Sequence, residues 1–91
     1  MRFEWNKAKR RSNLHRHGID FADAERVFAG ETVTFLDDRF EYGETRFLTF
    51  GLLWEEVVAI VHTETDDVIR VISVRRASRN EEESYFAEVR D

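Results

Sequence analysis

At the start of the chain, the pattern of hydrophobic and polar residues changes from the two-residue spacing of a strand to a pattern typical of a helix. Phe3 and Trp5 lie two apart, which is typical of a short strand or an extended lead-in. The residues that follow, 7–17, are mostly polar and predict a helix with one broad solvated face. Asn6 can cap this helix through its side-chain oxygen, and Gly18 suits a left-handed helix end.

A second helix is predicted by the segment "GIDFADAERVFAGE". Asp20 is its expected cap, Ile19 can pack onto Ala24 as a hydrophobic staple, and Gly30 ends it. Four apolar residues recur at helical spacing and predict the buried stripe of this helix: Phe21, Ala24, Val27 and Phe28.

The middle of the chain reads as strands. "TVTFLDD" predicts the first, and "TRFLTFGLL", "EVVAIVHTE" and "DVIRVISVR" predict three more. Gly43 lies in the acidic loop "DDRFEYGE", and the later turns are centred on Trp54 and Glu55 and on "TETDD". Connections this short require antiparallel neighbours. The continuous apolar run 57–61 predicts a strand that is covered on both faces.

The segment "SRNEEESYFAEVR" predicts a closing helix. Ser78 and Glu81 match a capping box, and the inner stripe is expected to hold Tyr85, Phe86 and Val89. The predicted fold is therefore α+β: two N-terminal helices, an antiparallel meander of about four strands, and a C-terminal helix. At 91 residues the chain is expected to form one domain, 1–91.

Composition adds expectations about the setting. The chain has no cysteine, so neither disulfides nor thiolate metal sites are available. The start lacks the apolar run of a signal peptide, and no stretch approaches the length of a membrane span. We therefore expect a soluble cytoplasmic protein without a membrane partner.

Charge is distributed unevenly along the chain. The formal net charge is -5, yet residues 1–17 hold six basic side chains against one acid, Glu4. Residues 70–80 hold four arginines and no acid. If these two segments meet in space, they form a local basic groove on an acidic protein, and such a groove can attract nucleic acid.

Three residues of the first predicted helix lie four apart and therefore share one face: Lys9, Asn13 and His17. A cation, an amide and a titratable imidazole could together hold a phosphate and transfer a proton. The alternative is a solvated helix face that ends in a histidine.

Arg70 interrupts an otherwise apolar strand, where a guanidinium needs a carboxylate, a phosphate or water. Strand alternation predicts that Arg70 and Arg75 point to opposite faces. The alternative to a substrate contact is a structural ion pair of Arg70 with Glu44 or Glu64.

Arg75, Arg76 and Arg79 flank the start of the last predicted helix, where free backbone N–H groups already favour an anion. Cations are unfavourable at this end of a helix, which indicates an external anion: nucleic-acid phosphate or the acidic surface of a protein partner. Glu81 is expected to act in the capping box more than as a base. Tyr85 is expected to lie in the core, although a phenol at the sheet rim could stack on a base or donate a proton.

Metal ligation is not expected. His15 and His17 are two apart on a helix and point to different sides, and His62 is alone on its strand. The chain has no P-loop, Rossmann glycine pattern or serine nucleophile motif, and we expect no cofactor.

Assembled, these pieces resemble the BrnT family of toxins from bacterial type II toxin–antitoxin pairs, within the wider RelE and ParE-like group. The resemblance is carried by "FEWNKAKRRSNLHRHGIDFADAERVF" and "RVISVRRASRNEEESYF", with "YGETRFLTFG" and "VVAIVHTE" between them. It implies a small ribonuclease that blocks translation by cutting RNA. It also implies a cognate partner, a BrnA-like antitoxin of the ribbon-helix-helix type, which forms a hetero-oligomer with the toxin and alone contacts DNA.

Metal-independent RNA cleavage needs a group that deprotonates the 2′-hydroxyl and donors that stabilise the charged phosphorane. The catalytic candidates are His17, Lys9, Arg75, Arg79 and Tyr85, and the substrate-binding candidates are Arg46, Arg70, Arg76 and Asn13. Two other functions remain open: a non-catalytic module that binds an acidic peptide or DNA, such as a decayed toxin or a co-repressor, and gyrase poisoning as in some ParE-like proteins.

Overall fold

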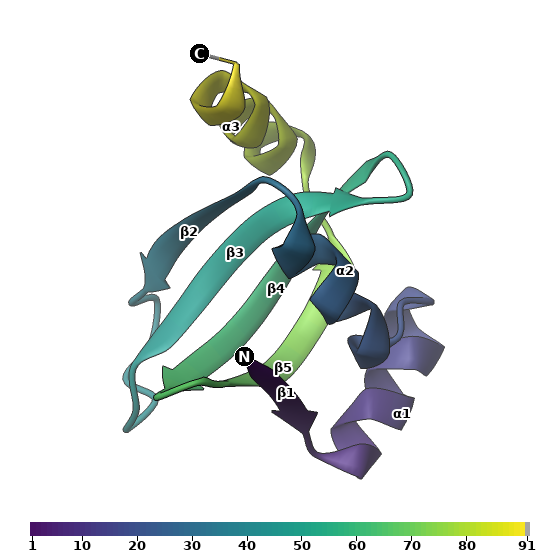
Figure 1. Ribbon diagram of the computed structural model, residues 1–91, viewed down its shortest axis with the longest axis vertical. Coiled ribbons are helices and arrows are strands. Elements are labelled where there is room, and N and C mark those ends of the chain that lie inside the picture. Colours follow the sequence, from purple (N-terminus) through teal and green to yellow (C-terminus); the bar gives the residue numbers. More distant parts are fainter. Residues whose placement is uncertain (91) are drawn as a thin grey trace.

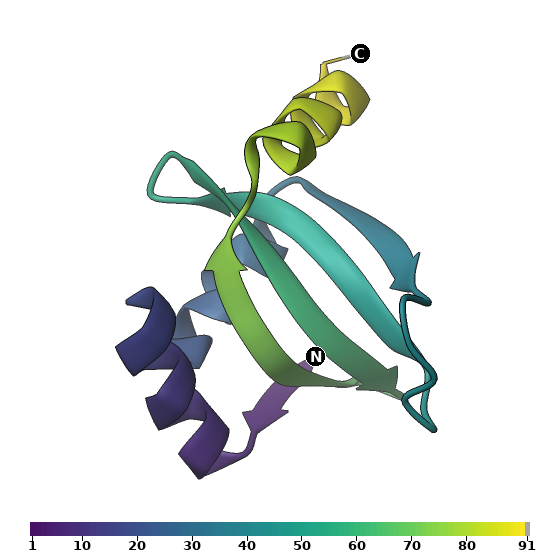
Figure 2. The ribbon, with the colours of Figure 1, turned by 180° about the vertical axis from the view of Figure 1, so that it is seen from behind.

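The computed structural model describes residues 1–90 as one five-stranded sheet with helices on both sides (Figure 1). Helix α2 lies on one face of the sheet, α1 lies beside the edge formed by β5, and α3 lies across one end of the other face (Figures 1 and 2). In chain order the elements are β1 (Arg2–Trp5), α1 (Lys7–His17), the short 3-10 helix η1 (Phe21–Asp23), α2 (Ala24–Ala29), β2 (Thr32–Asp37), β3 (Arg46–Leu53), β4 (Glu56–Thr65), β5 (Val68–Arg76) and α3 (Arg79–Val89).

The sheet is mixed, which corrects the predicted antiparallel meander of about four strands. Strands β2 to β5 do form that antiparallel meander. The spatial order of the whole sheet is β1-β5-β4-β3-β2. The lead-in β1 adds a fifth strand parallel to β5, with Phe3 opposite Ile69 and Trp5 opposite Val71. Because Phe3 and Trp5 alternate with polar neighbours, they pack against the core beneath the helices and hold β1 on the sheet.

The predicted helix ends of α1 and α3 are confirmed. The side chain of Asn6 accepts a hydrogen bond from the backbone N–H of Lys9, and Gly18 ends α1 at φ 72°. Ser78 and Glu81 form both halves of the capping box of α3. These contacts depend on residues three or four apart, so the sequence alone was sufficient to predict them.

The second predicted helix is divided. Asp20 caps it through the backbone N–H of Ala22, as expected, but Phe21–Asp23 form a 3-10 turn before the short helix α2 begins. The backbone N–H of Asp23 bonds to the carbonyl of Asp20, three residues back, which gives this tighter turn. Its apolar stripe is buried as predicted, except for Phe28, which is partly buried.

The sheet buries apolar side chains on both faces. Under η1 and α2 the core includes Phe21, Val27, Ile60 and Val74, while under α3 it includes Phe50, Val57, Ala59 and Tyr85. Strand β4 supplies residues to both clusters, which confirms the prediction for the run 57–61. Helix α2 approaches β3 at Gly51, where an added Cβ would lie 2.5 Å from Cγ1 of Val27.

Two tight turns connect the long strands. Trp54 and Glu55 form the turn between β3 and β4 and both have positive φ angles, 48° and 70°. Strand β4 ends one residue later than predicted, at Thr65, and β5 begins one residue later, at Val68, so that Asp66 and Asp67 separate them. No helix within residues 1–90 has the length and apolar character required to cross a bilayer.

Candidate functional site

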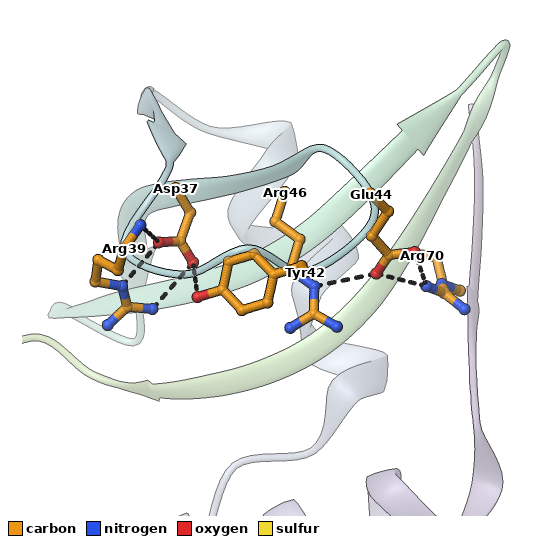
Figure 3. Close-up of polar contacts among 6 residues, drawn as sticks. All are labelled: Asp37, Arg39, Tyr42, Glu44, Arg46 and Arg70. Atoms are coloured by element: carbon orange, nitrogen blue, oxygen red, sulfur yellow. Dashed lines mark hydrogen bonds and ion pairs between the residues drawn. The ribbon is translucent and has the colours of Figure 1, made fainter.

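The face of the sheet opposite α2 carries a row of charged and polar side chains. Figure 3 shows six of them lying one beside the next. They come from the end of β2, the loop 38–45, the start of β3 and the middle of β5: Asp37, Arg39, Tyr42, Glu44, Arg46 and Arg70.

Glu44 joins two strands at one end of this row. Its carboxylate accepts from Nε of Arg46 at 3.0 Å and from Nη2 of Arg70 at 3.0 and 3.1 Å (Figure 3). The guanidinium of Arg46 also lies over the ring of Tyr42, 4.1 Å from its centroid. The hydrogen bonds of Arg46 and Arg70 hold the pKa of Glu44 below its usual range. Arg70 therefore makes the ion pair that the sequence left open as an alternative.

Asp37 organises the other end of the row. Its side chain is almost fully buried, and Arg39 binds both carboxylate oxygens at 2.7 and 3.0 Å. The hydroxyl of Tyr42 donates to the same carboxylate at 3.2 Å. These hydrogen bonds, that of Arg39 above all, lower the pKa of Asp37.

Arg75 links β5 to the start of α3. Its two terminal nitrogens donate to both oxygens of Glu81 at 2.7 and 3.0 Å, and Glu81 also accepts from the backbone N–H of Ser78. The hydrogen bond from Arg75 is the main reason that the pKa of Glu81 falls to about 2. For Arg75, the mismatch of a cation with a helix N-terminus is thus offset inside the protein, because Glu81 of that helix pairs with its guanidinium.

Arg70 and Arg75 lie on the same face, which corrects the prediction from strand alternation. Arg70 is opposite Thr63 and Arg75 is opposite Ala59, two residues of β4 with the same parity. A β-bulge makes this possible: β5 has one extra residue, Ile72, between the residues opposite Val61 and His62. Simple alternation fails wherever a bulge intervenes.

Helix α1 lies beside the free edge of β5. The side-chain amide of Asn13 donates to the carbonyls of Val74 and Ile19, at 2.8 and 3.1 Å, and accepts from the backbone N–H of Val74 at 3.1 Å. Asn13 is buried and acts here as a substitute for a neighbouring strand. These bonds use both donors of its amide, which favours a structural role over substrate binding.

Lys9 and His17 line a shallow depression of about 160 Å³ together with Asn13 and Arg16. Burial lowers the pKa of His17, and the positive charges of Arg16, Arg75 and Arg76 lower it further. The imidazole is therefore neutral at pH 7 although the surface around it is cationic. The structure thus brings His17 near Arg75 and Arg76, two of the residues predicted to share its site.

Arg76 and Arg79 differ in how they are held. Arg76 donates to the backbone carbonyl of His17 at 3.1 Å and to Glu56 at 2.7 Å. Arg79 is exposed, with 91% of its side chain accessible, and lies 4.0 Å from Glu83. Arg46 and Arg70 point from the face opposite Arg76, so the predicted arginines do not form one cluster.

Tyr85 is buried, and its hydroxyl donates to the carbonyl of Glu31 at 2.9 Å. Burial raises the pKa of this phenol. Its contacts favour packing of α3 against the sheet over contact with a substrate.

The sequence did not single out Asp37, Arg39 or Tyr42, because the acidic segment "DDRFEYGE" was interpreted only as a loop. The sequence feature that could have identified them is the position of Arg39 and Tyr42 among acidic residues directly after a predicted strand. Within residues 1–90 no three His, Asp or Glu side chains are grouped to hold a metal ion.

Comparison with known proteins identifies relatives of this arrangement. The family described as "Ribonuclease toxin, BrnT, of type II toxin-antitoxin system" matches residues 5–81. The crystal structure of the Brucella abortus ribonuclease toxin BrnT is similar, with a TM-score of 0.64 and 25% sequence identity, over 87% of this chain and 99% of that one. Among curated proteins, no sequence matches significantly.

Proposed function

Because this chain belongs to the BrnT family of ribonuclease toxins of type II toxin–antitoxin systems, we propose that it is an endoribonuclease that blocks translation by cutting RNA. The observation that best supports this proposal is the position of His17: Arg76 donates to its backbone carbonyl at 3.1 Å, and its side chain lines a depression with Lys9 and Arg16. Burial and the nearby cations also lower the pKa of its imidazole. An imidazole in this state can accept a proton at neutral pH, while the neighbouring guanidinium groups attract phosphate.

The proposed reaction needs no metal. His17 accepts the proton of the 2′-hydroxyl, the 2′-oxygen attacks the adjacent phosphorus, and the bond to the 5′-oxygen breaks. The products are a 2′,3′-cyclic phosphate and a 5′-hydroxyl that has taken up a proton. Arg75 and Arg76 point from opposite faces of β5, but both lie at its end, where their charges act on His17. Together with Arg79 they are the proposed donors to the negative charge that develops on the phosphorane.

Lys9 has a different part in this proposal. It lies two helical turns from His17, about 12 Å along the axis of α1, so both side chains are poorly placed to serve one phosphorus atom. Both nevertheless line the same depression. We therefore assign Lys9 to the RNA backbone beside the cleaved bond. Arg46 and Arg70, on the open face, are proposed to bind the strand further away.

The proposed partner is a BrnA-like antitoxin with a ribbon-helix-helix fold. It would silence the toxin in a hetero-oligomer, and DNA would be contacted only through the antitoxin. The cytoplasm is the proposed compartment, since RNA and the translation machinery are found there.

One observation favours a second candidate, a non-catalytic binding module. Arg70, Arg75 and Arg76 are each paired with a carboxylate in the free protein, so an RNA phosphate must compete with Glu44, Glu81 or Glu56. A surface of matched ion pairs can also recognise a charged protein partner.

Induced expression separates these functions. An active toxin arrests growth and fragments rRNA or mRNA, and co-expression of the antitoxin restores growth. Binding to the antitoxin without RNA cutting would indicate the module, and a DNA-damage response would indicate gyrase poisoning. With purified protein in chelator, a single-stranded RNA is expected to be cut and the same RNA with 2′-deoxyribose at the cleaved position is expected to stay intact.

A further inference from the structure

Trp54 occupies an unusual place at the tip of the β3–β4 hairpin. It is 68% exposed, and its φ angle of 48° lies in the left-handed region that bulky side chains rarely adopt. Asn and Gly are the residues that favour such two-residue turns. An exposed indole held in a costly backbone conformation suggests that the ring has a role outside folding.

The surroundings of Trp54 connect it to the proposed cleavage site. It lines a small depression of about 80 Å³ with Gly18, Glu56 and Arg76. Arg76 in turn donates to the backbone carbonyl of His17. These contacts place the tip of the β3–β4 hairpin beside the C-terminal end of α1.

The charges here favour a nucleic acid over an apolar protein surface. Arg76 neutralises the carboxylate of Glu56 at 2.7 Å, so Glu55 is the acid of the turn whose charge is not offset by Arg76. Lys9 and Arg16 add positive charge along the neighbouring depression. The depression beside Trp54 combines the apolar side chains of Ile19, Leu53 and Val58 with the ion pair of Arg76 and Glu56. Aromatic rings beside cations are the usual platform for unpaired bases.

We propose that Trp54 stacks on an unpaired base of the single-stranded RNA substrate next to the cleaved bond. This inference depends on the proposed RNA substrate but not on cleavage. It makes the chain selective for single strands, because a base within a duplex cannot leave its neighbours without a cost in free energy.

The test is the affinity for a single-stranded 2′-O-methyl RNA, which cannot be cut through its 2′-oxygen. Stacking contributes about 1–3 kcal/mol per base, so Trp54→Leu is expected to weaken binding by about 5- to 160-fold. Trp54→Phe is expected to retain part of the affinity. Phe40→Leu is the matched control, since Phe40 is also 69% exposed but lies in the loop 38–45, and it is expected to change affinity less than about twofold.

Fluorescence gives an independent readout, because the chain has only two tryptophans. RNA is expected to quench the emission of the wild-type protein, but not that of Trp54→Phe, which retains the partly buried Trp5.

Equal affinity of Trp54→Leu and wild type for RNA would overturn the stacking role, and cleavage in that case would leave the proposed function intact. If RNA binding depends on Trp54 but no RNA is cut, the stacking role stands and the proposed cleavage activity is wrong. Loss of antitoxin affinity in Trp54→Leu with unchanged RNA affinity would assign the tryptophan to the protein partner instead.

Discussion

Asn13 on α1 pairs with the backbone of Val74 on β5 across 61 positions of sequence, through one hydrogen bond in each direction. β1 pairs with β5 only as far as Val71, so no strand within residues 1–90 pairs with the edge of β5 beyond that point. The amide takes the place of such a strand. It also fixes α1, and with it His17, beside the arginines that follow Val74.

The first prediction concerns this pair. Asn13→Asp keeps the shape of the side chain but replaces two donated hydrogen bonds with a carboxylate that faces two carbonyl oxygens. We expect the free energy of unfolding in urea to fall by about 2–4 kcal/mol. Ser12→Ala, one residue earlier on the exposed face of α1, is expected to change it by less than about 0.5 kcal/mol. Equal stability of the two variants would contradict the role assigned to Asn13.

Tyr85→Phe separates packing from catalysis. The change removes only the hydrogen bond to the carbonyl of Glu31, so we expect a loss of about 1 kcal/mol in the free energy of unfolding. The rate of RNA cleavage is expected to stay within about threefold of wild type. A loss of about 100-fold, comparable to that for a missing transition-state donor, would return Tyr85 to the catalytic group.

His62 predicts a dependence of stability on pH. Its side chain is fully buried, its Nε2 bonds to the hydroxyl of Thr49 at 2.7 Å, and its Nδ1 has no hydrogen-bond partner in the described chain. Burial lowers its pKa from 6.5 to about 4. Between these values the unfolded chain binds the proton more tightly, so acid favours unfolding.

The expected loss from this group is about 3 kcal/mol as the pH falls from 6.5 to 4. Urea unfolding across this range tests it, and His62→Leu should remove most of the slope. The lowered pKa of Glu81 acts in a lower window, from 4.5 down to about 2, and remains in the variant. An NMR titration that gives His62 a pKa near 6.5 would refute this account.

The β3–β4 turn predicts a gain in stability. Glu55 has a φ angle of 70°, a conformation that is sterically unfavourable for a residue with a Cβ atom but not for glycine. Glu55→Gly is therefore expected to raise the free energy of unfolding by about 0.5–1 kcal/mol. Glu83→Gly makes the same exchange inside α3 and is expected to lower it by a similar amount. If both changes destabilise the protein, the turn is not strained at Glu55.

The sequence predicted the parts of the fold that depend on near neighbours. Caps at Asn6, Asp20 and Ser78 follow from contacts within three residues, and the tight turn at Trp54 follows from the hydrophobic runs on either side. The parallel pairing of β1 could not be predicted in this way, because it depends on contacts between residues 2–5 and 68–71.

The candidate site was harder to predict for the same reason. One extra residue, Ile72, places Arg75 on the face of Arg70 and leaves Arg76 beside His17. Glu81 was correctly predicted in the capping box, but its bidentate pairing with Arg75 depends on how β5 meets α3. Sequence identifies the charged groups, while the bulge and the ion pairs decide which of them lie together.

The most direct test of the central claim is the rate at which purified protein cuts a defined single-stranded RNA in chelator. Arg75→Ala combined with Arg79→Ala is expected to reduce this rate by about 100-fold or more. The control Arg26→Ala with Arg90→Ala removes the same charge elsewhere and is expected to leave the rate unchanged, with folding of both checked by thermal unfolding. A folded Arg75/Arg79 variant that cuts within about threefold of wild type would contradict the proposed site.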